Sequence, residues 1–351
     1  AQRFMRWAAE VRSHYLDRMT DVMPRSDAAA IFAILFGGYE GIRPELLDSF
    51  TATGIVHILS VSGSHISLLA AVIAWTAVFF RFPKWLSISV VVFAIVVYVI
   101  LAGLVPPAVR SGIMGGAAFL GLVLGRERNA QYLLILTGLL MLIVSPLLFF
   151  HISFQLSFLA TAGLLFFAPI LKERMKRLPP PISGSLSITI AAQLSTLPVL
   201  AWHFNQISLS ALLSNLLVVP IIELIIILGL AGGILAFFLP VLGSIIFAAD
   251  SLLLGIAFEM SRAFAALPFS QLWIPSPGIG SGLCYYMLLA SVCMPAEYQK
   301  TIYLSLKRHH QAIGKTFLII LIAFLSWRYT LPDEMEVHFI DVGQGDCALV
   351  I

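Results

Sequence analysis

The chain has 351 residues, of which 60% are hydrophobic and only 11% are charged, and its formal net charge is +3. This composition excludes an ordinary soluble domain and predicts a helical protein that crosses a membrane several times. The net charge is too small to indicate nucleic-acid binding by itself, and three cysteines do not make a disulfide framework.

Residues 1–27 form a basic segment at the start of the chain. Arg6, Arg12 and Arg18 recur among apolar residues, which predicts an amphipathic helix lying in the membrane interface. The apolar residues that follow, 28–38, are too few to span a bilayer, since about 20 are needed.

Residues 54–69 lie in an apolar run long enough to cross a bilayer, yet they carry two histidines and four serines. On a continuous helix, one broad face holds His57, Ser60, Ser64, His65 and Ser67. Polar side chains at membrane depth normally face a protein interior or a watery cavity, so we predict a lined cavity here. Tight helix packing through small residues is the alternative. The sequence from Ser62 to Ser64 is also a candidate break in the helix.

Further apolar runs predict an all-α polytopic membrane protein with about 9–10 transmembrane helices, some of them broken or re-entrant. Pro220 lies within one long run and is expected to break it. The expected crossings are 55–80, 85–103, 106–124, 130–145, 147–170, 183–203, 208–238, 241–266, 279–294 and 315–328.

Basic residues occupy every second loop between these runs, and the positive-inside rule places those loops in the cytoplasm. The uncharged loops at 104–106, 144–147 and 204–207, the loop 267–278 and everything after Arg328 then face outside. The basic start of the chain is also placed outside, against the rule. Three interpretations of that start remain open: an interfacial anchor, a basic surface that attracts phosphates, or a crossing by residues 28–38.

Polar residues also recur inside the later runs. Arg110 stands in the first turns of run 106–124, where it either extends outward to the interface or points into a cavity as an anion contact. In the same run, Gly112 and Gly116 have the spacing of a close helix contact. Other positions that we expect to line a path are His151, Gln155, Gln193, His203, Asn215 and Glu223.

The chemistry of these positions favours a polyanion over an inorganic cation. A cation path is expected to have acidic rings, whereas Glu223 is the main acid here. Amide and hydroxyl donors beside aromatic faces suit a strand that carries bases, because stacking tolerates every base. One polar stripe usually means packing, but five on separate segments favour an aqueous path.

The last 21 residues, 331–351, change character. Alternating apolar residues around a Gly-Gln-Gly turn predict a strand, a turn and a second strand that open a soluble β domain. Because this pattern stops within a strand, we expect the chain to be a fragment of a longer protein at both ends.

Five motifs resemble the ComEC family, the competence channel proteins of bacterial natural transformation. They cover nearly the whole chain in the family order, and the first has Leu-Ser where many members have Leu-Ala. The motifs are HILSVSGSHISLL (57–69), AGLVPPAVRSGIM (102–114), FQLSFLATAGL (154–164), QLSTLPVLAWHFNQISLSALLSNLLVVP (193–220) and IDVGQGD (340–346).

The resemblance implies a channel region over 28–330 that imports single-stranded DNA across the bacterial cytoplasmic membrane, followed by the first strands of a metallo-β-lactamase-like domain on the outer side. It also implies an external DNA receptor and a cytoplasmic ATP-dependent translocase, because no Gly-rich phosphate loop is present. A divalent metal is expected in the C-terminal domain, with its ligands after residue 351. We therefore predict no cofactor, catalytic residue or metal ligand in this chain.

Two other functions remain open at this stage. A small-solute or ion transporter would also use broken helices, and the helices could serve as a scaffold for an extracellular metal-dependent hydrolase. In the channel interpretation, the phosphate contacts are Arg110 and the outer arginines Arg6, Arg12 and Arg18.

Overall fold

The computed structural model describes residues 2–123, 129–268, 270–274, 276–293, 337–341 and 346–350. The chain divides into two compact units, Ala1–Met287 and Leu288–Ile351. The helices of the first part are α1 (Gln2–Thr20), α2 (Arg25–Phe36), α3 (Pro44–Ala52), the 3-10 turn η1 (Val56–Leu59), α4 (Gly63–Phe79), α5 (Lys84–Leu101), α6 (Pro106–Val123) and α7 (Ala130–Val144).

The later elements follow the same helical pattern, with short strands between helices. They are η2 (Pro146–Phe150), α8 (Ile152–Phe166), α9 (Ala168–Arg174), α10 (Pro180–Phe204), β1 (Gln206–Ser208), α11 (Ala211–Leu217), α12 (Val219–Phe238), α13 (Pro240–Ala265), β2 (Gln271–Trp273), α14 (Ile279–Cys293), β3 (Val337–Asp341) and β4 (Asp346–Val350).

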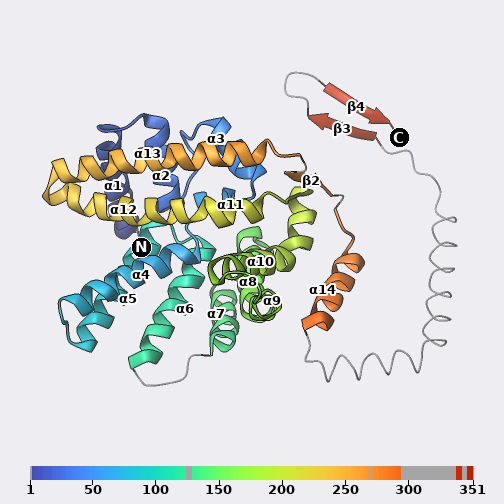
Figure 1. Cartoon of the computed structure of the whole chain (residues 1–351), viewed down its shortest axis with the longest axis horizontal. Coiled ribbons are helices and arrows are strands. Elements are labelled where there is room, and N and C mark those ends of the chain that lie inside the picture. The colour runs from blue at the N-terminus through green and yellow to red at the C-terminus, as the bar shows by residue number, and fades with distance from the viewer. Residues whose placement is uncertain are drawn as a thin grey trace. The chain divides into compact units, whose positions relative to one another are not determined.

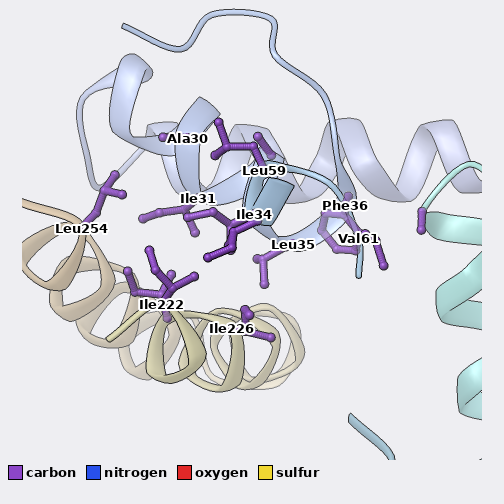
Figure 2. Packing of buried hydrophobic residues seen from close by; sticks show 14 of the residues in the cluster. Ala30, Ile31, Ile34, Leu35, Phe36, Leu59, Val61, Ile222, Ile226 and Leu254 are labelled. Atoms are coloured by element: carbon purple, nitrogen blue, oxygen red, sulfur yellow. The ribbon is translucent and has the colours of Figure 1, made fainter. Parts of the chain in front are cut away.

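Helices α12 and α13 pack against each other as a long antiparallel pair (Figure 1). Helix α2 lies against this pair, and Ile31, Ile34 and Leu35 are fully buried there. Figure 2 shows these side chains facing Ile222 and Ile226 of α12. A helix that is apolar on all sides is expected in a protein interior. At 12 residues, α2 is about 18 Å long, so it is too short to cross a bilayer by itself, as predicted for residues 28–38.

Large apolar side chains are exposed along the outer faces of the helices, among them Trp75, Phe93, Ile143 and Phe237. A soluble monomer does not expose so much contiguous apolar surface. Within the described residues, four helices are long and apolar enough to cross a membrane, namely α5, α10, α12 and α13, and the bent pair α8–α9 is a fifth if it counts as one span. The chain is therefore an α-helical membrane protein.

Several predicted crossings have different boundaries in the structure. The run 55–80 is α-helical only from Gly63, after the short 3-10 turn η1, and α4 and α7 are apolar but shorter than a full crossing. The run 147–170 bends by 43° between α8 and α9. The break predicted near Pro220 is confirmed, because α11 ends at Leu217 and α12 begins at Val219. The predicted crossing 315–328 lies outside the described residues.

Loops that the charge pattern assigns to one side of the membrane lie together. Strand β1, from the loop after α10, pairs antiparallel with β2, from the loop after α13. At Gly103, just before α6, a Cβ would stand 3.9 Å from Nη1 of Arg12 in α1. The loops after α10 and after α13 therefore lie together, as the alternation of basic loops predicts for this pair. The side of the loop before α6, and which side is outer, stay predictions.

The C-terminal strands form a unit that we describe by itself. Strand β3 pairs antiparallel with β4, with Val337 opposite Val350 and Asp341 opposite Asp346. The two predicted strands are therefore confirmed, and the turn between them lies outside the described residues.

Two glycines of α6 were predicted to make close helix contacts, and only one of them does. A Cβ at Gly112 would stand 2.9 Å from Cγ2 of Val99 in α5, so glycine is needed for that approach. At Gly116 nothing lies within 4 Å. The predicted contact at Gly116 is wrong, because the residue of α6 that faces α5 after Gly112 is Gly115, where a Cβ would stand 3.7 Å from Cδ1 of Ile95.

Asp250 is a polar exception in the packed α12–α13 pair. It is fully buried, and neither carboxylate oxygen has a hydrogen-bond partner among the described residues. Its Oδ2 lies 3.3 Å from the place where a Cβ at Gly229 of α12 would stand. Ionising a carboxyl group in such surroundings costs several kcal/mol.

Asp250→Asn should therefore raise the midpoint of thermal unfolding in detergent at pH 8, by an amount equivalent to about 1 kcal/mol, because the amide keeps the shape and cannot ionise. The matched control is Glu259→Gln on the same helix, where the carboxylate is exposed and the midpoint should hardly move. A clear drop in the midpoint of Asp250→Asn would contradict the prediction.

Candidate functional site

The segment from Gly54 to His65 connects α3 to α4 and is the centre of the candidate site. Gly54 has a φ of 70°, and a Cβ there would stand 2.9 Å from Cβ of Ala211 and 3.0 Å from Cβ of Ser208. Only glycine combines that left-handed backbone with so close an approach. The segment therefore packs directly against the chain between α10 and α11.

The first histidine of the segment lies in the short turn η1, not on a long helix. Nδ1 of His57 lies 3.0 Å from the carbonyl oxygen of Gly54, and Ser60 donates its hydroxyl to the carbonyl of His57 at 3.0 Å. The prediction of one helical face for His57, Ser60, Ser64 and His65 is wrong, because residues 60–62 are extended. The predicted break at Ser62–Ser64 is confirmed, since α4 begins at Gly63.

Ser62 and His65 close the start of α4 as a capping box. Nδ1 of His65 accepts from the N–H of Ser62 at 3.2 Å, and Nε2 lies 2.9 Å from the carbonyl oxygen of Ile34. Because a carbonyl can only accept, Nε2 carries the proton and the imidazole is neutral in this arrangement. His65 is 1% exposed, so it joins α4 to α2. Ser64 beside it is exposed.

Arg110 of α6 points into the protein. Its side chain is 8% exposed, Nε donates to the hydroxyl of Ser157 in α8 at 2.7 Å, and Cζ lies 6.0 Å from the ring centroid of Phe158. The alternative in which Arg110 extends outward to the interface is therefore wrong. Within the described residues Arg110 forms no ion pair, although ion pairs are found elsewhere in the chain.

Helices α4, α6 and α8 meet around Gly63. A Cβ at Gly63 would stand 3.0 Å from Oγ of Ser111 and 3.3 Å from Nη2 of Arg110. The buried hydroxyl of Ser111 has no hydrogen-bond partner in the described part of the chain. The start of α4, an arginine and an unpartnered hydroxyl thus lie together.

A second polar group lies at the other end of the Gly54–His65 segment. The predicted residue Gln193 of α10 donates to the carbonyl of Ser208 at 3.0 Å. The hydroxyls of Ser208 and Ser210 both donate to the carbonyl of Ala52, at 2.7 Å and 3.3 Å. The segment therefore runs from Gln193 of α10 and the serines before α11 to the polar residues of α4, α6 and α8.

The structure does not join the remaining predicted residues to these groups by hydrogen bonds. Gln155 donates to the nearby carbonyl of Phe149 at 2.9 Å, and Arg12 packs over Phe32 with Cζ 5.3 Å from the ring centroid. Burial lowers the pKa of Arg12, against an opposing effect of Glu40. The exposed residues of the set are Arg6, Arg18, His151 and His203, and the half-buried ones are Asn215 and Glu223. Their lining and phosphate roles stay predictions.

Two surface cavities lie along α13, away from these groups. One, of about 680 Å³, is lined by α13 alone, and the other, of about 250 Å³, lies between Arg43, Ser49 and Phe258. Neither includes a predicted channel residue. No group of three potential metal ligands occurs among the described residues. The divalent metal that the family resemblance implies is expected to bind after residue 351, so it stays a prediction.

Sequence reasoning missed four residues of the site: Gly63 as a contact point, Ser111, Ser157 and Ser208. Ser111 follows Arg110 directly, and Ser157 lies between Gln155 and Phe158 in a motif that was recognised. A search for faces on single helices passed over them, because their partners lie on other helices. The motifs themselves were the available signal.

A model of the competence protein family matches residues 34–298, which is most of the chain. The chain belongs to the competence protein family. This competence protein is similar to ComE operon protein 3 of Bacillus subtilis (strain 168), with 26% identity over 344 residues that cover 97% of this chain and 42% of the relative. It is also similar to a protein of Escherichia coli (strain K12) named "Uncharacterized protein YcaI", with 25% identity over 354 residues that cover 97% of this chain and 45% of the relative.

The chain thus spans less than half the length of either relative. No solved structure matches it. The resemblance to the ComEC family is confirmed by the family match and by the relative from Bacillus subtilis.

Proposed function

We propose that this competence protein forms a channel that passes single-stranded DNA across the bacterial cytoplasmic membrane during natural transformation. The observation that carries the proposal is the segment Gly54–His65, which runs between two polar groups. One group comes from α4, α6 and α8, and the other is Gln193 of α10 with Ser208 of β1.

The chemistry of this region suits a strand of nucleotides. A guanidinium without a carboxylate partner attracts phosphate, and the exposed side chains of His57 and Ser64 offer polar contacts beside it. Sparse positive charge favours passage over tight retention, because each phosphate contact adds to binding strength. The proposed strand therefore passes from the Arg110 group along the Gly54–His65 segment.

The proposal includes a sidedness and partners. The basic loops face the cytoplasm, so the loops before α6 and after α10 and α13, together with the C-terminal strands, are on the outer side of a multi-pass protein. A receptor outside delivers the DNA, and a separate ATP-dependent translocase in the cytoplasm pulls it, since the sequence has no phosphate-binding loop of its own.

The test is transport by the purified chain in liposomes that enclose a single-strand-binding protein as a trap. Labelled single-stranded DNA added outside should become protected from an added nuclease over minutes, whereas a duplex of the same sequence stays accessible. Empty liposomes should protect neither. Release of a small dye without protection of DNA would favour a small-solute transporter, which the broken helices also suit, and would overturn the channel. Protection of neither would favour the scaffold alternative.

A further inference from the structure

We propose that Arg110, Ser111 and the amino terminus of α4 form a binding site for one phosphate group. The ligand class is a phosphodiester, and the assignment of its source to single-stranded DNA rests on the proposed function. The site extends the predicted role of Arg110 to three groups that act together, two of which, Ser111 and the start of α4, no sequence pattern indicated.

The first argument is an uncompensated positive charge. Arg110 is 8% exposed and forms no ion pair with any described residue. A buried charge normally needs a partner of opposite sign, because desolvation is costly. Of its five N–H donors, Nε bonds to Ser157, and Nη1 has only the sulfur of Met114 at 3.6 Å.

The start of α4 adds to the same positive potential. Arg110 is the fifth residue of α6, and its Nη2 points at Gly63, the first residue of α4. The amino terminus of a helix carries a partial positive charge of about half an elementary charge. The neighbouring His65 does not compensate it, since its imidazole is neutral and bonded to Ile34. Without an anion, like charges would face each other there.

The donors that an anion needs are present and unused. The hydroxyl of Ser111 is buried without a partner in the described chain. The side chain of Ser62 caps the N–H of His65, which leaves the N–H groups of Gly63 and Ser64 at the open end of α4. Such free N–H groups are the usual contacts of a phosphate at a helix start.

Gly63 brings these donors together. With any side chain, Cβ would stand 3.0 Å from Oγ of Ser111 and 3.3 Å from Nη2 of Arg110. Both distances are tighter than ordinary van der Waals contact, so a side chain would push the arginine away from the helix start. Position 63 has the ordinary backbone conformation of a right-handed helix, so the backbone does not require glycine there. The close approach of Arg110 and Ser111 explains the glycine instead.

The test measures thermal unfolding of the full chain in nanodiscs of phosphatidylcholine, titrated with inorganic phosphate or with a short single-stranded oligothymidylate. Both should raise the unfolding midpoint of the wild type. Ser111→Ala is the key variant, because its hydroxyl has no partner to lose, so the fold should be unaffected while the apparent Kd weakens several-fold. Arg110→Gln should weaken it about tenfold or more, the loss expected for a charge-assisted hydrogen bond. Gly63→Ala should also weaken it.

The matched control is Arg262→Gln, since Arg262 is exposed and its nearest acid is Glu259 at 4.0 Å. Its apparent Kd should equal that of the wild type. Unchanged phosphate binding in both Ser111→Ala and Arg110→Gln would overturn the site. If Arg110→Gln fails to fold, Ser111→Ala and Gly63→Ala decide the question alone.

Two further arms separate the ligand sources and the two proposals. If phosphatidylglycerol in the nanodiscs abolishes the shift of the unfolding midpoint caused by the oligothymidylate, a lipid headgroup occupies the site and the assignment to DNA is overturned. A midpoint shift equal to that in phosphatidylcholine supports the assignment to DNA. If the wild-type protein binds phosphate, and Ser111→Ala weakens that binding, but the wild type transports no DNA, the phosphate site is supported and the channel is refuted. DNA transport that is indifferent to all three substitutions refutes the site and retains the channel.

Discussion

Gly163→Val should separate α8 from α10 and destabilise the protein by about 3 kcal/mol, as expected for overpacking against a fixed backbone. A Cβ at Gly163 would stand 2.6 Å from the carbonyl oxygen of Ala191 and 2.8 Å from Cβ of Ser195, both in α10. The carbonyl belongs to a helix and cannot rotate away, so the two helices must move apart. Thermal unfolding in detergent would report the loss as a lower midpoint.

The control for this prediction is Gly184→Ala in α10, where nothing lies within 4 Å of the new methyl group. It should leave the midpoint unchanged or raise it, since alanine favours a helix over glycine by up to about 1 kcal/mol. If Gly163→Val unfolds at the wild-type temperature, α8 and α10 do not pack as described.

The second large effect is on transport. Replacing His57, Gln155 and Asn215 together with leucine should reduce protection of single-stranded DNA to the level of empty liposomes. None of the three is fully buried, so leucine is accommodated in the fold, but an apolar lining excludes water and the charged strand. Normal unfolding temperature with lost transport is the expected combination.

Ser281→Leu is the matched control, because Ser281 is exposed on α14 and its hydroxyl bonds only within its own turn. Transport by this variant should equal that of the wild type. Should the triple variant still import DNA at the wild-type rate, these three residues do not line the path.

The stretch 54–80 illustrates how far sequence reasoning reached. Its apolar run and its polar residues were both recognised, and so was the small-residue centre that breaks it. The prediction that its polar residues share one helical face was wrong, because that pattern assumes one regular helix. The carbonyl of Ile34 and the close approach of Ala211 decide the actual course, and neither is encoded within the run.

Arg110 illustrates the same limit at a single residue. The sequence predicted that Arg110 lies in the first turns of a helix, but it did not predict whether the side chain extends to the membrane interface or into the protein interior. The choice depends on Ser157, which lies 47 positions further along the chain. Because helix periodicity relates neighbours three or four residues apart, it carries no information on such a pair.

The sequence by itself determined that this competence protein is a bundle of apolar helices in a membrane, that the chain breaks near Ser62–Ser64 and Pro220, and which family it belongs to. Those properties follow from local composition and from motifs that lie within single segments. Only the tertiary structure decided that α2 is a buried core helix, that Gln193 joins Ser208 and that Arg110 meets the start of α4. These contacts join residues distant along the chain, and they arise from close approaches between helices that no single segment specifies.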